Sequence, residues 1–308
     1  MGETNNKRIL ITGVAGFLGS NLAKNLAESG ADVTGADTPS ALASSNLSEL
    51  APAVSLNTAD VTDYVSLTKL GSKFDCIIHL AALAAPKKCD DNPSLAFEIN
   101  VHGTHNVLKF ALETNATRFV FPSTAHVYGI SPKYIPTDEN HPLALQNTYT
   151  TSKILGESLC KLFYSNHGLS YATLRLFNVY GPGQTQDYFV PSMIIKAKQG
   201  FIMLRGSEVT KDFVYVSDMT DAFEKAIGSD YVGEINVGTG IQTKLETVAR
   251  YIANVIGAKF GVDDDAVDGP TFMQCDPSRA IRMLHWRPRV PLERGLDTTI
   301  NWFKARST

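Results

Sequence analysis

The sequence has few cysteines, and they are scattered along the chain. Its four cysteines are Cys76, Cys89, Cys160 and Cys275, and none of them lies in a Cys-x-x-Cys pair or beside histidines with zinc-site spacing. We therefore expect reduced thiols and no bound metal. The sequence also lacks an apolar run of the roughly 20 residues that cross a bilayer, so we expect no membrane partner.

Targeting signals and a basic surplus are missing too. The first residues, MGETNNKR, contain no apolar core of a secretory signal, and Asn6 stands where a myristoylation motif has Ser or Thr. We expect a cytoplasmic protein. The formal net charge is −3, which argues against a nucleic-acid partner.

What the sequence does contain is a regular alternation of strand and helix patterns, with enough apolar residues (44%) for a full core. This alternation predicts a Rossmann-like α/β fold with a doubly wound, mostly parallel sheet. The strands are expected at Arg8–Thr12, Asp32–Ala36, Phe74–Leu80, Arg118–Ser123 and Ser170–Leu176. The helices are expected at Phe17–Ser29, Asp63–Leu70, Pro93–Thr114 and Tyr149–Asn166.

After Phe177 the alternation breaks into shorter elements that end in an amphipathic helix at Leu292–Lys304. We expect residues 1–177 to form the nucleotide-binding domain and residues 178–308 to form mainly a smaller α/β cap that binds substrate. The segment Asp212–Ile227 resembles a return to the main sheet, so a return segment is expected near residues 212–237.

A glycine-rich turn follows the first predicted strand and opens the first predicted helix, as a pyrophosphate-binding turn requires. Gly13 permits the tight turn, Gly16 lets the backbone approach the phosphates, and Gly19 lets the helix pack on the strand. The helix N-terminus then offers free N–H groups to the pyrophosphate. The spacing is GxxGxxG rather than the usual GxGxxG, and a glycine-rich turn alone fits many α/β proteins.

Acidic residues after the next two strands refine the expected ligand. Asp37 lies about twenty residues beyond the turn, where a carboxylate accepts hydrogen bonds from the adenosine ribose. It would repel a 2′-phosphate, and no arginine follows it, so NAD is favoured over NADP. Asp60 and Val61 are candidates for contact with adenine, although an ordinary turn aspartate would fit Asp60 equally well.

Tyr149 and Lys153 are four residues apart and would share one face of a helix. A tyrosine pKa near 10 must fall by about three units, or about 4 kcal/mol, for the phenol to act as a base at neutral pH. A cation about 4 Å away supplies about that much at an effective dielectric of about 20, and it must outweigh burial. Thr124, at the carboxyl end of a strand, could bridge the substrate oxygen and the Tyr149 phenol. The plainer alternatives are a solvated helix and a polar strand end.

These pieces occur together in a recognisable order. The chain resembles the extended short-chain dehydrogenase/reductase family, in its NAD-dependent nucleotide-sugar epimerase/dehydratase branch, and within it resembles the UDP-glucose 4-epimerase type. The matching motifs are TGVAGFLG (12–19), HLAA (79–82), NVHGT (100–104), PSTAHVYG (122–129), YTTSK (149–153), LRLFNVYGPG (174–183), KDFVYV (211–216) and DPSRA (276–280).

The resemblance implies a role for each matching residue. Thr124, Tyr149 and Lys153 would be the catalytic triad, and Asn178 would contact the diphosphate of the nucleotide sugar. His79 would be a strand-end residue without a catalytic role. A homodimer would form by a four-helix bundle of Pro93–Thr114 and Tyr149–Asn166 from two subunits. The residues implied to line the NAD site are Gly13, Gly16, Phe17, Leu18, Gly19, Asp37, Asp60, Val61, Leu80, Ala81, Ala82, Asn100, Ser123, Tyr149, Lys153 and Phe177.

The residues after Thr124 bear on the reaction. Similar 4,6-dehydratases carry Asp-Glu there and the decarboxylases carry Glu, whereas this chain has Ala125 and His126. Because elimination of water needs such proton donors, we expect a nucleotide-sugar 4-epimerase that passes through a 4-keto intermediate. Two alternatives stay open: a net NAD-linked dehydrogenase or ketoreductase of a sugar or small alcohol, and a non-catalytic NAD-binding regulator.

Two departures from the family pattern concern the substrate. Lys211 stands where relatives have an arginine that grips the diphosphate, and Ala266 stands where they have a second one. Loss of the bidentate hydrogen bonds of an arginine weakens the binding of a diphosphate. Arg205 or Arg279 could compensate; otherwise the substrate is not a UDP-sugar, or not a nucleotide sugar at all.

Overall fold

The chain folds around one parallel sheet. The computed structural model describes residues 4–43, 47, 53–263 and 272–306. All neighbouring strands of the sheet run parallel, which confirms the doubly wound α/β fold. From edge to edge, the seven strands are β11 (Gly233–Val237), β6 (Ser170–Leu176), β5 (Arg118–Thr124), β4 (Cys76–His79), β1 (Arg8–Thr12), β2 (Asp32–Asp37) and β3 (Ser55–Thr58).

Helices cover both faces of this sheet because its central strands are apolar on both sides. Along β1, Ile9 and Ile11 point to one core and Leu10 points to the other, and none of the three is exposed. The first core is covered by α1 (Phe17–Glu28) and α9 (Val216–Gly228). The second is covered by α3 (Tyr64–Thr68), α6 (Thr104–Glu113) and α7 (Thr148–His167).

The helical segment expected at Pro93–Thr114 is not one regular helix. It consists of α5 (Pro93–Phe97), a π-helical stretch at Glu98–Gly103, and α6. A further helix, α4 (Pro86–Asp91), precedes it, and α2 (Pro39–Leu42) follows β2. Neither short helix was predicted. Their lengths of six and four residues are too short to show a helical period.

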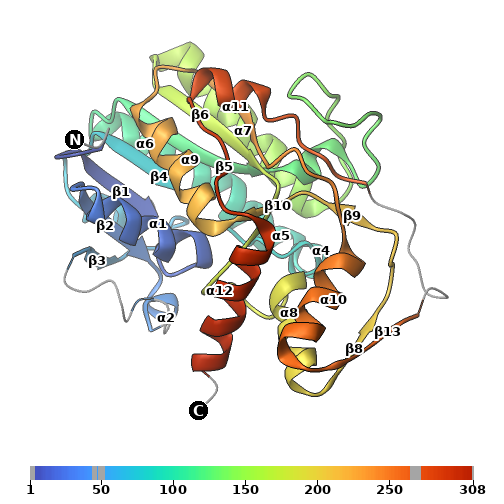
Figure 1. Cartoon of the computed structure of the whole chain (residues 1–308). Coiled ribbons are helices and arrows are strands. Elements are labelled where there is room, and N and C mark those ends of the chain that lie inside the picture. Colours follow the sequence, from blue (N-terminus) through green and yellow to red (C-terminus); the bar gives the residue numbers. More distant parts are fainter. Residues whose placement is uncertain (1–3, 44–46, 48–52, 264–271, 307–308) are drawn as a thin grey trace.

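A smaller group of elements has its own hydrophobic core, with Ile194, Ile202, Ile252 and Ile300 unexposed. Figure 1 shows these elements gathered in the lower part of the picture, below β5 and β6. The expected C-terminal amphipathic helix is among them. The elements are α8 (Phe189–Lys198), β8 (Phe201–Leu204), α10 (Leu245–Ile256), β13 (Lys259–Val262) and α12 (Leu292–Ala305), with β8 paired to β13.

The chain returns to the main sheet within the expected segment 212–237, but the first strand of this segment does not join that sheet. The strand β10 (Phe213–Tyr215) pairs with β7 (Asn178–Tyr180) in a separate two-stranded sheet. The helix α9 and the strand β11 make the return, and β11 pairs with β6 at the sheet edge. The remaining described elements are β9 (Thr210–Lys211) paired with β12 (Thr243–Lys244), α11 (Ser278–Met283), and a short 3₁₀ helix (Ala125–Tyr128) after β5.

Candidate active site

The glycine turn between β1 and α1 has the close contacts that its sequence predicts. Gly13 has a φ of +74°, and a Cβ there would lie 2.7 Å from the Leu80 carbonyl carbon. A Cβ on Gly19 would overlap the Gly13 carbonyl oxygen, so α1 packs on the turn only with glycine at this position. Gly16 lines both cavities described below, which leaves its backbone open to a ligand.

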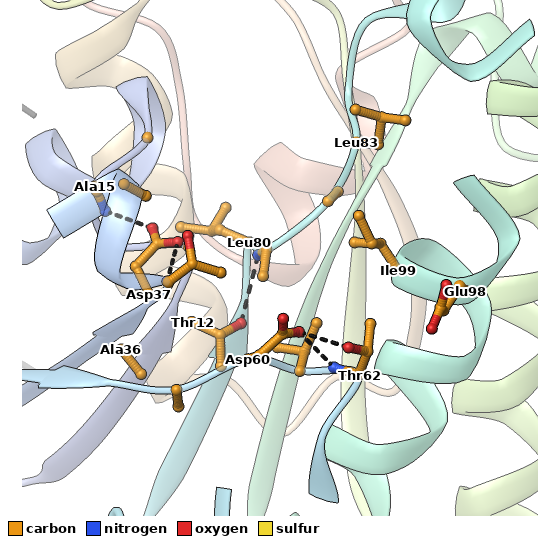
Figure 2. A pocket seen from close by; sticks show the side chains of 18 of the residues that line it. Thr12, Ala15, Ala36, Asp37, Asp60, Thr62, Leu80, Leu83, Glu98 and Ile99 are labelled. Atoms are coloured by element: carbon orange, nitrogen blue, oxygen red, sulfur yellow. Dashed lines mark hydrogen bonds between the residues drawn. The ribbon is translucent and has the colours of Figure 1, made fainter. Parts of the chain in front are cut away.

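The first cavity, of about 550 Å³, lies over the ends of β1, β2 and β3. Asp37 lies at its rim, as Figure 2 shows. One carboxylate oxygen accepts a hydrogen bond from the Ala15 amide (3.0 Å) and the other accepts one from the Thr38 amide (2.9 Å). Burial raises the pKa of Asp37. The carboxylate thus ties the end of β2 to the glycine turn while it faces the cavity.

Asp60 and Val61 line the same cavity. The Asp60 carboxylate accepts hydrogen bonds from the amide (2.9 Å) and the hydroxyl (2.8 Å) of Thr62 (Figure 2). This is the behaviour of a turn aspartate, the alternative left open by the sequence. Asp60 therefore shapes the cavity floor, and Thr62, which was not predicted, joins the lining.

The second cavity, of about 570 Å³, lies at the carboxyl ends of β5 and β6. It shares Gly13, Gly16, Phe17, Leu80, Ala82 and Thr185 with the first cavity, so the glycine turn separates two halves of one groove. Leu18 and Gly19 also line it. The predicted residues that come together here from distant parts of the chain are Ser123, Thr124, Tyr149, Lys153, Phe177, Asn178 and Lys211.

The beginning of α7 positions Tyr149 and Lys153. The Asn147 side chain caps the helix by accepting a hydrogen bond from the Thr150 amide (2.9 Å), in a reciprocal capping box. Tyr149 therefore lies in the first turn, and Lys153 lies one turn further on. The Lys153 ammonium donates a hydrogen bond to the Pro122 carbonyl oxygen (3.0 Å) and lies 4.9 Å from the centre of the Phe121 ring.

The sequence predicts that Lys153 lowers the pKa of Tyr149. Among the side chains of the protein itself this prediction is wrong. Burial dominates and raises the pKa of Tyr149, and a hydrogen bond with Thr124 opposes this rise. Burial also lowers the pKa of Lys153 to about 8. A lowered pKa would need a cation about 4 Å from the phenol, whereas the Lys153 ammonium is directed to the end of β5.

His79 has the structural role expected from the sequence. It is buried, and burial lowers its pKa to about 3. The Thr104 hydroxyl donates its proton to the Asn100 carbonyl (2.6 Å), so His79 Nε2–H donates to Thr104 (3.0 Å) and Nδ1 accepts from the Thr12 hydroxyl (2.8 Å). A neutral histidine thus joins β1, β4 and α6.

Asn100, expected in the NAD site, lies behind it. Among the described residues it lines neither cavity. Its side chain accepts a hydrogen bond from the Leu83 amide (2.8 Å) and donates to the Leu83 carbonyl (3.0 Å) and to the Ser152 hydroxyl (2.9 Å). Leu83 lines the first cavity, so Asn100 holds this part of the wall through its hydrogen bonds. Its place in the π-helical stretch could not be read from periodicity.

The basic residues expected near the substrate separate in the structure. Lys211 lines the second cavity, where burial lowers its pKa to about 8, and no carboxylate in the described part of the chain pairs with it. Its ammonium lies 3.3 Å from the Met273 sulfur. Arg205, 70% exposed in its side chain, pairs with Asp263 (3.6 Å) away from the cavity. Arg279 pairs with Glu139 (3.3 Å), and neither arginine is among the residues that line the two cavities; Ala266 lies outside the described residues.

The lining contains polar groups that have no protein partner. The Ser123 hydroxyl is buried and has no hydrogen-bond partner in the described chain. His126, Tyr188 and Thr185 also line the second cavity, and the last two were missed because their loop has no sequence periodicity. An unpartnered buried hydroxyl beside an open glycine turn fits a polar ligand such as a dinucleotide.

No group of side chains suited to hold a metal ion occurs among the described residues, and no described helix is long and apolar enough to cross a membrane.

Comparison with known proteins gives consistent matches. Residues 9–238 match the family model described as "NAD dependent epimerase/dehydratase family". The UDP-glucose 4-epimerase of Mycolicibacterium smegmatis is 31% identical over 317 residues, covering 97% of this chain and 99% of that protein. The UDP-glucuronic acid decarboxylase 1 of Xenopus tropicalis is 30% identical over 315 residues, covering 99% of this chain and 74% of that protein.

The fold also matches solved structures. The crystal structure of the Thermus thermophilus UDP-glucose 4-epimerase in complex with NAD superposes with a TM-score of 0.87 at 27% identity, covering 97% of this chain and 99% of that one. These matches confirm the resemblance expected from the sequence, and they confirm NAD as the cofactor. They include enzymes of more than one reaction type.

Proposed function

The chain belongs to the NAD dependent epimerase/dehydratase family, and from this premise we propose that it epimerises a nucleotide sugar at C4 by reversible oxidation. The observation that carries the proposal is the convergence of Thr124, Tyr149 and Lys153 in one cavity beside the glycine turn. This triad suffices for chemistry confined to one carbon that bears a hydroxyl.

The proposed NAD site is the groove on both sides of the glycine turn. The N-terminus of α1 faces the pyrophosphate, Asp37 accepts hydrogen bonds from the adenosine ribose, and Val61 lies against the adenine. On the other side, Ser123 supplies its unpartnered hydroxyl and Lys153 its ammonium near the nicotinamide end. Leu80, Ala81, Ala82 and Phe177 complete the walls.

When bound, NAD accepts a hydride from the substrate carbon and later returns one. Tyr149 accepts the proton of the C4 hydroxyl, and Thr124 holds the same oxygen through its hydroxyl. Burial raises the pKa of Tyr149, so this transfer depends on positive charge nearby. The Lys153 ammonium is charged at pH 7 but directed to Pro122, so the positively charged nicotinamide ring of bound NAD would supply most of this charge.

The proposed substrate is a UDP-sugar. Lys211 is a half-buried cation without a carboxylate partner in the described chain, so an anionic diphosphate would satisfy it. Asn178 lines the same cavity beside it. The names of the relatives, which refer to UDP-glucose and UDP-glucuronic acid, support a uridine nucleotide. In this proposal residues 1–177, with a return near 212–237, bind NAD, and residues 178–308 mainly bind the sugar.

The test is an assay of the NAD-loaded protein with UDP-glucose, UDP-galactose, their N-acetyl forms and UDP-glucuronic acid. We expect interconversion of a C4 epimer pair without accumulation of free NADH, because the cofactor is regenerated. Net formation of NADH would favour the dehydrogenase alternative. Retained NAD without any oxidation of these sugars would contradict the proposal and favour a regulator.

We also propose a homodimer in which α6 and α7 form a four-helix bundle with their copies. Leu155 (41% exposed) and Leu162 (50% exposed) are seven residues apart on α7 and leave an apolar stripe on its surface. The Leu155→Glu/Leu162→Glu variant should sediment as a monomer if the bundle forms. A cytoplasmic location stays a prediction from the sequence.

A further inference from the structure

Residues 182–188, which lie between β7 and α8, cross the NAD groove, and we call them the strap. One wall of the groove consists of the glycine turn and the start of α1, and the other consists of the segment that follows β4 and enters α4. At the first wall, the Asn21 side chain on α1 donates a hydrogen bond to the Pro182 carbonyl oxygen (3.1 Å). At the second wall, Lys88 on α4 pairs with Asp187 (3.3 Å). The strap therefore connects the two walls.

The middle of the strap lies where the two halves of the groove meet. Six residues line both cavities, and five of them belong to the glycine turn, the start of α1 or the segment after β4. The sixth is Thr185, which comes from the strap. The glycine turn with its helix N-terminus is the expected position of the NAD pyrophosphate. A dinucleotide bound there would therefore lie between the glycine turn and the strap.

The two ends of the strap are held with unequal strength. Near the first end Gln184 is buried, and its side chain donates a hydrogen bond to the Val179 carbonyl oxygen of β7 (2.8 Å). Residues 185–188 are exposed, and their link to the opposite wall is the pair of Lys88 and Asp187, whose side chains are 64% and 54% exposed. An ion pair this exposed is weak and is screened by salt. The second end can therefore leave α4 while the first end stays in place.

We propose that the strap is a gate for NAD and that the ion pair between Lys88 and Asp187 holds it closed. Loss of the pair frees residues 185–188 from α4 and opens the groove at the glycine turn. The two charged side chains act by positioning the strap, and Lys88 is not among the residues that line the cavities. The gate requires NAD but not the proposed C4 reaction, so a protein that oxidises none of the five UDP-sugars named above still tests it.

The experiment measures the rate at which NAD leaves the protein. The protein is loaded with isotope-labelled NAD and diluted into an excess of unlabelled NAD, and the label that stays bound is counted at intervals after filtration. In Asp187→Asn the strap loses its ion pair, so we expect release at low salt to be about 2- to 5-fold faster than in the wild type. The charge exchange Lys88→Asp/Asp187→Lys should restore most of the slow release, because it restores the pair.

Salt and a neighbouring ion pair supply the controls. Because added salt screens exposed charges, release from the wild type should approach the rate of Asp187→Asn, and release from that variant should change little. The matched control is Lys87→Gln, which removes the exposed pair of Lys87 and Asp91 (3.1 Å) within α4 itself. This variant should release NAD like the wild type, because its pair does not reach the strap. A wild-type rate in Asp187→Asn would overturn the role of the ion pair.

A cross-link tests the gate itself, because it prevents opening. In Lys88→Cys/Asp187→Cys a short bis-maleimide joins the strap to α4, while the four native cysteines are buried. When NAD is bound before joining, we expect its release to be at least about 10-fold slower than from the same variant without the cross-link, as for a ligand whose exit requires a lid to open. Equal release before and after joining would overturn the gate and leave the proposed function intact.

Discussion

Lys153 donates a hydrogen bond of 3.0 Å from its ammonium group to the main-chain carbonyl oxygen of Pro122. This contact joins the first turns of α7 to the end of β5. Tyr149 lies one helical turn before Lys153, and Ser123 and Thr124 directly follow Pro122. The bond therefore fixes the relative position of the residues to which we assign acid–base chemistry.

Replacement of the proposed base should stop turnover without loss of the cofactor. In Tyr149→Phe the ring remains and the hydroxyl is lost, so we expect kcat for C4 epimerisation to fall by about 10³-fold or more. NAD should stay bound, as measured by the absorbance of the nucleotide released on denaturation. Tyr134→Phe, which removes an exposed hydroxyl that donates to Asp138 (2.7 Å), is the control and should be fully active. An active Tyr149→Phe enzyme would exclude the assigned base.

The affinity for a nucleotide sugar should depend on the charge of Lys211. Burial lowers the pKa of Lys211 to about 8, so its charge is present below pH 8 and is lost as the pH rises through that value. We expect KM to rise above pH 8. Lys211→Arg should remove this dependence, because a guanidinium stays charged.

The comparison variant for this pH series is Lys211→Gln. It should raise KM about 10- to 100-fold at pH 7, the loss of one charge-assisted hydrogen bond. Lys153 also has a pKa of about 8 and would act on kcat, so KM is the quantity to compare. A KM that is equally pH-dependent in Lys211→Arg would exclude Lys211 as the binding cation.

The buried ion pair behind the site should be sensitive to removal of one partner. Arg175 and Glu157 form two hydrogen bonds of 3.0 and 2.7 Å, and their side chains are 3% and 2% exposed. Arg175→Met leaves the Glu157 carboxylate buried without its counter-charge, so we expect a loss of about 3–5 kcal/mol in urea unfolding. The double variant Arg175→Met/Glu157→Leu should regain much of that stability, and a single variant as stable as the wild type would contradict this account.

Gly19 should tolerate no side chain. In Gly19→Ala the new Cβ would overlap the Gly13 carbonyl oxygen and approach the Val14 Cα to 2.8 Å, so α1 must shift away from the turn. We expect the purified variant to retain little NAD. Gly168→Asn at the end of α7 is the control: a Cβ there meets nothing within 4 Å, and Asn tolerates the φ of +73°. If Gly19→Ala retained as much NAD as the wild type, the close packing of α1 against the Gly13 carbonyl would not be needed for NAD binding.

The parts of the fold that the sequence predicted are those governed by local rules. The strand positions follow from short apolar runs, and the amphipathic helix at the C-terminus follows from its period. The segment Pro93–Thr114 shows the limit of such rules. Its π-helical stretch is coupled to hydrogen bonds between Asn100 and Leu83, which are distant in the chain, so no local pattern marked it.

The candidate active site also combines features that follow from local sequence with features that depend on tertiary contacts. The identities of Tyr149, Lys153 and Thr124 followed from spacing and motif, and the structure brings them to one cavity. The direction of the Tyr149 pKa was wrong, because it depends on how the Lys153 ammonium is aimed and on how much water the cavity excludes. The ion pair of Arg205 with Asp263 could not be predicted for a related reason: these residues directly follow β8 and β13, which only the fold brings side by side.

The sequence by itself determined the layered α/β architecture, the glycine turn and the set of acid–base residues, because these depend on residue identity and on spacing within single elements. Only the tertiary structure decided that Asn100 holds Leu83 behind the cavity wall, that Lys211 is the half-buried cation in the second cavity, and that the buried Ser123 hydroxyl has no partner in the described chain. Burial and hydrogen bonding are properties of groups brought together across the sheet, and a linear pattern does not contain them.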